Sequence, residues 1–454
     1  MPLIKKAAFL SSILLFQCAA VIFSTVMFLD GRYAGKVQQG ITVNDVPVGG
    51  LSPVEAVQRL ESTIPDPPLS ALRIKDAGKS YVIYLPDIDG IYDYRSTIEE
   101  ALAYGKKGNI FDRFTSTPQL RAAPIDLAIK IAFSEEKLAE KLKCLKDEWE
   151  TPAEDAEVKL SDDKVIITPE KKGYSLDLEK TLEQVSRDLA GGNLNVAASG
   201  RILEPPISTS DLNGIDTLLS EYITTFNNSD ENRSHNIALA SAAINGTLLK
   251  PGEVFSLNRQ LGPRLAESGY LEAPVFIGNG LSLDFGGGVC QVATTLYNTV
   301  LLSDLEVVER YPHPQPVSYV SPGRDATIAG DYLDLKFTNN TGAPVYISSL
   351  LESGKSGTLT VSIFGEEKSK SHTVRITSEK TVFEPKVIVV EDNSLPEGET
   401  EVVNSGRAGY EARVYREVVV DGQVQSRNQI SSDYYISEDK IVHVGPKPEG
   451  TVKK

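Results

Sequence analysis

Residues 286–297 read GGGVCQVATTLY, where three glycines lead directly into Cys290 and into a stretch with helical spacing. An apolar stripe predicts a core-facing helix and comprises Val289, Val292, Ala293, Leu296 and Val300. Cys290 lies off this stripe, in a first helical turn whose dipole and unpaired N–H groups stabilise a thiolate. Free cysteine is also among the most buried residue types. The residues alone therefore leave a nucleophile and a small buried side chain equally open.

The chain as a whole is long and acidic, with an ordinary globular composition. It has 454 residues, of which 41% are hydrophobic, so we expect several domains with cores of their own. The formal net charge of −16 argues against a nucleic acid partner, because phosphate contacts require a basic surface. The same charge disfavours simple electrostatic docking onto anionic wall polymers or lipid.

The N-terminal segment carries an uncharged apolar run over residues 7–29. A helix of that length spans a hydrocarbon core of roughly 30 Å. Because Lys5 and Lys6 precede the run and Asp30 follows it, residues 1–34 are predicted to be a cytoplasmic stub and a transmembrane anchor. The other domains are then extracytoplasmic, on a single-pass protein of the cell membrane. A cleaved signal peptide is the alternative, but its apolar region would be shorter.

Residues 35–125 and 126–204 are predicted to be two related α+β repeats. In the first repeat, Ser52 and Glu55 form a capping-box start of a helix. The segments DGIYDYRSTIEEAL and KGYSLDLEKTLEQV then align between the two repeats. Cys144 lies in a predicted helix of the second repeat, in a different domain from Cys290, which favours two free thiols over a disulfide.

Beyond a proline-containing linker, residues 212–350 are predicted to form a dense central α+β domain. Residues 370–446 contain short alternating runs typical of strands, which predict an all-β domain. Asp421-Gly422 falls between two such runs and is a strong hairpin signal. Residues 447–454 are expected to be a disordered tail. The predicted chain is thus an α+β multidomain protein with a transmembrane helix at its N-terminus.

The central domain resembles the VanW family in the blocks NRSHNIALASAAINGTLLKPGEVFSLN and FGGGVCQVATTLYNTVLLSDLEVVERYPHPQPVSYVSPGRDATI. The two repeats resemble the YoaR-like peptidoglycan-binding domain, including the segment ALAYGKKGNIFDRF. The C-terminal strands resemble the G-five (G5) domain, and the matching glycines are Gly398, Gly406, Gly409, Gly422 and Gly445.

The resemblance to VanW implies an envelope protein and, for some members of that family, an L,D-transpeptidase whose nucleophile is the cysteine of the GGGVCQ block. It therefore implies that Cys290 forms a thioester with peptidoglycan stem peptides and that the enzyme makes 3-3 cross-links. Stem peptides and glycan are the implied partners. The alternative is a non-catalytic peptidoglycan-binding protein, of the accessory type associated with glycopeptide resistance.

A nucleophilic cysteine requires a base, and the chain offers four histidines. His313 lies between two prolines in a stiff extended segment, which suits a side chain aimed at one point, so we expect it to be the base. His235, at the start of a predicted helix, is the alternative base. Asp325 lies close downstream and would orient His313 through its second ring nitrogen, although capping of the next element is its ordinary role.

Other residues near Cys290 suggest supporting roles. The backbone around Gly287 and Gly288 would supply N–H groups for a developing oxyanion. Gln291 would donate to an oxyanion or to a substrate carbonyl, and Arg324 would pair with a substrate carboxylate. No paired histidine or cysteine spacing and no phosphate loop occurs in the sequence, so we expect neither a metal nor another cofactor.

Overall fold

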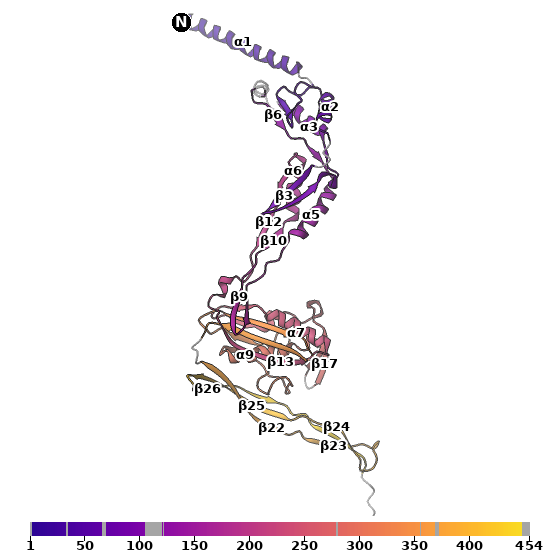
Figure 1. Ribbon diagram of the computed structural model, residues 1–454, viewed down its shortest axis with the longest axis vertical. Helices are drawn as coiled ribbons and strands as arrows, with labels where there is room; N and C mark the ends of the chain where they lie inside the picture. Colours follow the sequence, from indigo (N-terminus) through magenta and orange to yellow (C-terminus); the bar gives the residue numbers. More distant parts are fainter. Residues whose placement is uncertain are drawn as a thin grey trace, which may run out of the picture. The chain divides into compact units, whose positions relative to one another are not determined.

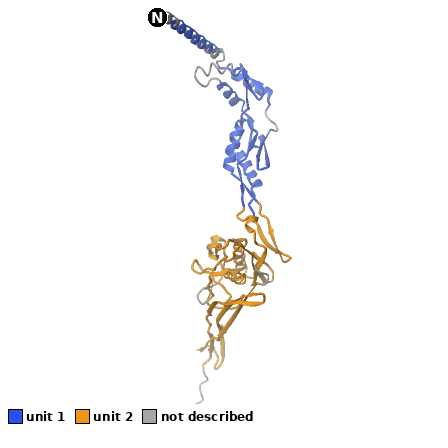
Figure 2. Cartoon of the chain, turned by 90° about the vertical axis from the view of Figure 1, so that its left-hand side faces the viewer, with its two compact units in different colours: residues 1–154, 172–204 blue, residues 155–171, 205–454 orange. Residues whose placement is uncertain are grey.

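The computed structural model describes residues 2–32, 35–65, 70–104, 120, 122–277, 280–354, 356–367 and 372–446. The chain forms two compact units, residues 1–154 with 172–204 and residues 155–171 with 205–454 (Figure 2). It has an N-terminal apolar helix, mixed α+β domains and an all-β C-terminal region (Figure 1), which confirms the predicted fold class. The predicted tail, residues 447–454, lies outside the described residues.

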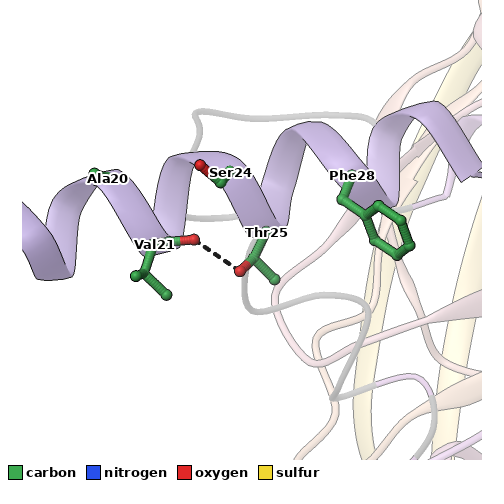
Figure 3. A pocket seen from close by; sticks show the side chains of 5 residues that line it. All are labelled: Ala20, Val21, Ser24, Thr25 and Phe28. Carbon is green, nitrogen blue, oxygen red and sulfur yellow. Dashed lines mark hydrogen bonds between the residues drawn. The ribbon is translucent and has the colours of Figure 1, made fainter.

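The apolar N-terminal segment forms α1 (Pro2–Arg32). Within it, Ala8–Thr25 has a mean hydropathy of 1.9, and the helix is long enough to cross a membrane. The Thr25 hydroxyl donates to the carbonyl of Val21 at 2.7 Å (Figure 3), so this polar group is satisfied inside the helix. These properties are compatible with a membrane anchor or with a signal sequence.

One hydrophobic core of the first unit is built around a three-stranded sheet of order β2-β1-β6. The capping box predicted at Ser52 and Glu55 is present and starts α2. Asn44 and Asp45 both have positive φ, at 44° and 66°, as a two-residue hairpin turn requires. The elements are β1 (Ile41–Val43), β2 (Val46–Pro47), α2 (Pro53–Thr63), α3 (Tyr94–Ala103) and β6 (Ile125–Leu127).

A second core in this unit combines residues 72–88, which lie within the sequence span of the first core, with residues 131–196, which follow it. The predicted boundary at residue 125 does not separate these cores, because Ile74 of β3 pairs with Val196 of β11 and both side chains are buried together. The elements are β3 (Ala71–Asp76), β4 (Lys79–Tyr84), η1 (Leu85–Ile88), β5 (Ile91–Tyr92), β7 (Ile131–Ala132), α5 (Glu135–Trp149), β10 (Gly173–Leu176), α6 (Leu178–Ala190), β11 (Asn195–Ala197) and β12 (Gly200–Leu203).

A hairpin within residues 126–204, the predicted second repeat, belongs to the second unit instead. It consists of β8 (Glu157–Ser161) and β9 (Lys164–Thr168). Val158 is buried in one cluster with Tyr346 and Phe364 of the central domain. The hairpin packs on the central domain because its apolar face is removed from water there.

The central domain is organised around a four-stranded antiparallel sheet of order β13-β21-β20-β14. Helix α9 packs on β13 and β21, and α7 packs on β20. The sheet includes residues up to Gly365, beyond the predicted end at residue 350. The elements are β13 (Thr217–Asn227), α7 (Glu231–Ile244), β14 (Thr247–Leu249), β15 (Val254–Ser256), α8 (Leu257–Leu261), β16 (Glu272–Ile277), β17 (Gly280–Phe285), α9 (Val289–Leu302), β18 (Glu306–Glu309), β19 (Lys336–Thr338), β20 (Val345–Glu352) and β21 (Ser356–Gly365), with short 3-10 turns η2 (Thr209–Leu212) and η3 (Ala266–Ser268).

The C-terminal region forms two three-stranded sheets, of order β22-β25-β26 and β23-β27-β24. The predicted hairpin is confirmed, because Asp421 and Gly422 both have positive φ and join β25 to β26. The strands are β22 (Thr373–Phe383), β23 (Val387–Glu391), β24 (Thr400–Asn404), β25 (Gly409–Val420), β26 (Gln423–Tyr435) and β27 (Lys440–Val444).

Candidate active site

Three glycines place Cys290 in the first turn of α9. Gly286 and Gly288 have φ of +82° and +106°, in the region that favours glycine. Position 287 requires glycine for a different reason, because a Cβ there would lie 2.7 Å from the backbone of Ala273 and Pro274. The strand β17 can therefore turn sharply into α9 and present Cys290 half-buried at the helix start.

The same turn leaves backbone donors open. The N–H groups of Val289 and Gln291 donate to the carbonyls of Gly286 and Gly288. Within the part of the chain that the structure describes, the N–H groups of Gly288 and Cys290 have no acceptor. Donors of this kind beside a nucleophile are suited to a tetrahedral oxyanion.

His313 and Asp325, which are far from Cys290 in sequence and are both buried, form a hydrogen-bonded group with it. Nδ1 of His313 lies 2.7 Å from Oδ2 of Asp325, and the backbone N–H of His313 donates to the same oxygen at 2.7 Å. The His313 ring also hydrogen-bonds the Cys290 side chain, and Nε2 is the nitrogen that Asp325 leaves available for this contact. In its protonated form, the Cys290 thiol also donates to the carbonyl of Ile328 at 3.5 Å.

The electrostatics favour a thiolate-imidazolium pair. Burial by itself raises the pKa of the Cys290 thiol, but the hydrogen bond and charge of His313 outweigh burial and hold that pKa below its ordinary value. Burial lowers the pKa of His313, yet its hydrogen bonds to Asp325 and Cys290 raise the pKa to about 9. Both shifts favour a proton on His313 and a negative charge on the sulfur.

Residues of the C-terminal strands complete the surroundings of Asp325. Tyr435 of β26 donates to Oδ1 of Asp325 at 2.5 Å, and it accepts a hydrogen bond from the N–H of Gly323. Arg310 pairs with Oδ1 of Asp325 at 3.2 Å and with Oδ2 of Asp433 at 2.6 Å. Both carboxylates and this guanidinium are buried, so their charges are compensated within one network.

Two of the predicted site residues have other partners. Gln291 is fully buried, and its amide is occupied by Thr224, Thr225 and Arg233. It therefore supports the core and does not donate to a substrate, which corrects the prediction. The Arg324 guanidinium donates to Asn298 and lies over the ring of Tyr222. These are neutral partners, and no contact in the described structure connects Arg324 to Cys290.

His235, the alternative base, lies on the surface away from this group. Its Nε2 is 2.9 Å from the carbonyl oxygen of Gly269. The structure therefore brings His313 to Cys290 and leaves His235 elsewhere. His372 and His443 lie near Asp304 and Asp392, respectively, rather than near Cys290.

Several residues of the site were not predicted. Arg310 lies three positions before His313, so its proximity in sequence could have indicated that it belongs to the site. Tyr435 and Asp433 gave none, because Tyr435 is 110 residues from Asp325 and in a different domain. Arg233 and Arg264, whose charges act on Cys290, come from two other segments of the central domain.

Comparisons with known families agree with the resemblance stated above. Residues 232–364 match the family described as "VanW like protein", and residues 374–447 match the G5 domain. Residues 81–197 match the family described as "Putative peptidoglycan binding domain". The chain therefore contains a VanW-like domain, a domain of this peptidoglycan-binding type and a G5 domain.

Two curated proteins are similar to parts of the chain. It is 37% identical over 183 residues to "Uncharacterized protein YoaR" of Bacillus subtilis (strain 168), covering 40% of this chain and 60% of that protein. It is 33% identical over 130 residues to "Vancomycin B-type resistance protein VanW" of Enterococcus faecalis (strain ATCC 700802 / V583), covering 28% of this chain and 47% of that protein. In each case the chain spans less than two thirds of the relative.

Two solved G5 domains are similar to part of the chain. The crystal structure of HP0197-G5 is 28% identical and covers 16% of this chain and 95% of that chain, with a TM-score of 0.13. The G5 domain of IgA1 protease is 23% identical and covers 17% of this chain and 92% of that chain, with a TM-score of 0.15.

Proposed function

We propose that the chain is a cysteine-dependent L,D-transpeptidase of peptidoglycan. The observation that supports this proposal is the buried group of Cys290, His313 and Asp325, in which the base and its orienting carboxylate stand in the order that acyl transfer requires. The partners are peptidoglycan stem peptides and glycan. The domain of peptidoglycan-binding type and the G5 domain would hold the enzyme on the wall, and α1 would anchor it with the N-terminus in the cytoplasm.

The first half-reaction forms a thioester. The Cys290 thiolate attacks the carbonyl of the third residue of a donor tetrapeptide, so a C–S bond forms and the carbonyl electrons move to oxygen. The N–H groups of Gly288 and Cys290 stabilise this oxyanion. When it collapses, the C–N bond breaks, and the departing D-alanine nitrogen takes the proton from His313.

The second half-reaction uses the same groups in reverse. An amine of a neighbouring stem loses a proton to His313 and attacks the thioester carbonyl. The new C–N bond completes the 3-3 cross-link, and the C–S bond breaks to release Cys290 as a thiolate. Attack by water in place of the amine would give hydrolysis instead of transfer, with the same thioester.

Mass spectrometry of the full chain with a disaccharide-tetrapeptide tests the proposal. We expect an adduct on Cys290 with loss of D-alanine, and cross-linked dimers when acceptor is present. The adduct should be absent in Cys290→Ala, while Cys144→Ala, which removes an exposed thiol elsewhere, should leave it unchanged. An intact Cys290 under all conditions would contradict the proposal.

A second candidate is a non-catalytic wall-binding protein. The match of residues 81–197 to a peptidoglycan-binding type of domain favours it, because binding alone would account for that domain. In that case Cys290→Ala would leave sedimentation of the chain with purified sacculi unchanged, and no adduct would form in the wild type.

A further inference from the structure

Arg264 lies against both segments that flank Cys290. Its side chain runs along Gly286, where an added Cβ would be 3.2 Å from Cβ and 3.6 Å from Cδ of Arg264. Its Nη2 donates at 2.8 Å to the carbonyl of Gly330, two residues beyond Ile328, whose carbonyl accepts from the Cys290 thiol. A guanidinium is therefore fixed beside the nucleophile.

Arg233 approaches the same turn from helix α7. A Cβ on Gly288 would lie 2.9 Å from Cγ of Arg233. Its Nη2 donates at 2.6 Å to Oε1 of Gln291, the residue after the nucleophile. Two cationic side chains therefore border the Cys290 turn, from different parts of the domain.

Neither arginine has a carboxylate partner in the described structure. Nη1 of Arg264 donates to Oδ1 of Asn258 at 3.0 Å and to the carbonyl of Gly262 at 3.4 Å, both neutral groups. Burial of a cation without an ion-pair partner costs free energy, and only Arg233 has a nearby acidic charge acting on it, that of Asp230. Arg310, in the same domain, is paired with two carboxylates.

The donors of Arg264 are also incompletely used. Its three hydrogen bonds engage both N–H groups of Nη1 and one of Nη2. Among the described residues, the Nε–H and the second N–H of Nη2 have no acceptor. A guanidinium with such donors remaining binds a carboxylate through charge-assisted hydrogen bonds, in a geometry that lysine does not reproduce.

We propose that Arg264, assisted by Arg233, binds a carboxylate that lies next to the bond attacked by Cys290. This inference rests on the proposed function, where that carboxylate is the free C-terminus of the departing D-alanine. Arg264 exchanges no proton and forms no covalent bond; it holds the donor peptide so that the preceding carbonyl faces the sulfur. The enzyme would therefore select peptides that end one residue beyond the attacked carbonyl.

Thiol alkylation tests the anion subsite without any peptide. The full chain in detergent is treated separately with iodoacetate and iodoacetamide, and carboxymethylation and carbamidomethylation of Cys290 are quantified by peptide mass spectrometry. Exposed Cys144 in the same sample is the internal reference. We expect Cys290 to favour the anionic reagent relative to Cys144, and Arg264→Gln to reduce this preference roughly five- to tenfold.

Two variants separate charge from shape. Arg264→Lys should retain most of the preference, because a point charge remains. Arg259→Gln, at an exposed arginine on nearby α8, should leave it unchanged. An equal ratio in wild type and Arg264→Gln would overturn the proposal, as would an equal loss in Arg259→Gln.

A peptide experiment distinguishes failure of the subsite from failure of the enzyme. Tetrapeptides with a free and an amidated C-terminus are compared for adduct formation on Cys290. Equal acylation by both peptides, in wild type and in Arg264→Gln, would overturn the subsite and leave the transpeptidase intact. No acylation by either, together with an Arg264-dependent preference for iodoacetate, would overturn the proposed function and leave the anion subsite standing.

Discussion

The hydroxyl of Tyr435 donates a 2.5 Å hydrogen bond to Oδ1 of Asp325, and both side chains are buried. Tyr435 is the last residue of β26, in the G5 domain, whereas Asp325 belongs to the VanW-like domain. The carboxylate that orients His313 is therefore held from outside its own domain, so a change in the G5 strands should be detectable at Cys290.

Tyr435→Phe is expected to destabilise the second unit. It removes the bond to Asp325 and leaves the buried N–H of Gly323 without its acceptor, a loss of about 1–3 kcal/mol. The measurement is the midpoint of thermal unfolding followed by fluorescence or calorimetry. Tyr434→Phe, at the exposed neighbour on the same strand, is the control. Equal shifts for the two variants would show that the buried hydroxyl contributes nothing special.

Asp433→Asn is expected to shift the pH profile of Cys290 alkylation, and not only to change the stability of the protein. Arg310 now shares its charge between Asp433 and Asp325; without Asp433 it would neutralise Asp325 alone. The imidazolium would lose part of its counter-charge, so the pKa of His313 would fall from about 9 and the pKa of Cys290 would rise. Asp421→Asn, an isosteric change in the exposed turn of the same hairpin, should leave the profile of Cys290 alkylation in place.

The wild-type chain should be alkylated at Cys290 at a pH below the ordinary thiol value of 9.0, because the pKa of this thiol is lowered. The thiolate is lost as pH falls through that lowered pKa, and the imidazolium is lost as pH rises through about 9. Transfer that needs both should therefore show a bell-shaped profile that lies between these limits.

His313→Gln leaves the burial of Cys290 but removes its charge partner. The thiol pKa should then rise above the ordinary value, and alkylation at pH 7 should slow by roughly tenfold or more. The rate at pH 7 with iodoacetamide is the readout. His235→Gln is the control, because the hydrogen bond that His235 makes in the described structure is to Gly269. A rate unaltered by His313→Gln would exclude the ion pair.

Gly288→Ala should cost more stability than an ordinary glycine substitution. Its φ of +106° disfavours a side chain, and a Cβ would also lie 2.9 Å from Arg233 and 3.0 Å from Ile237. We expect about 2–4 kcal/mol of destabilisation from strain and overpacking together. Gly252→Ala, with φ of +80° and no atom within 4 Å, isolates the strain alone. Unfolding midpoints of the two variants give the comparison.

Local signals in the sequence were sufficient for much of the fold. The capping box at Ser52, the turn at Asp421-Gly422 and the helix start after Gly288 each depend on neighbours within a few residues, and each is present. Pairing between distant strands has no such signal. For example, β3 pairs with β11, and the β8–β9 hairpin packs on Tyr346 and Phe364. Both contacts depend on which apolar faces meet in three dimensions.

The candidate site shows the same division. Cys290, His313 and Asp325 were chosen for their chemistry and local backbone, and the structure places them together, while their catalytic roles stay predictions. Gln291 and Arg324 were chosen for proximity in sequence, yet residue 291 on a helix buried on nearly all sides points into the core. Arg264 and Tyr435 could not be inferred, because only the folded chain brings them near.

The hairpin β8–β9 also affects how the protein can be divided. Because residues 155–171 belong to the second unit while the flanking segments belong to the first, the chain passes between the units at three points, near residues 154, 171 and 204. A protease that cut only near residue 204 would not release the part of the chain that contains Cys290 by that cut alone. The hairpin would still be covalently part of the N-terminal fragment and would remain packed on Tyr346 and Phe364. The two fragments would separate only after the hairpin dissociated from these residues.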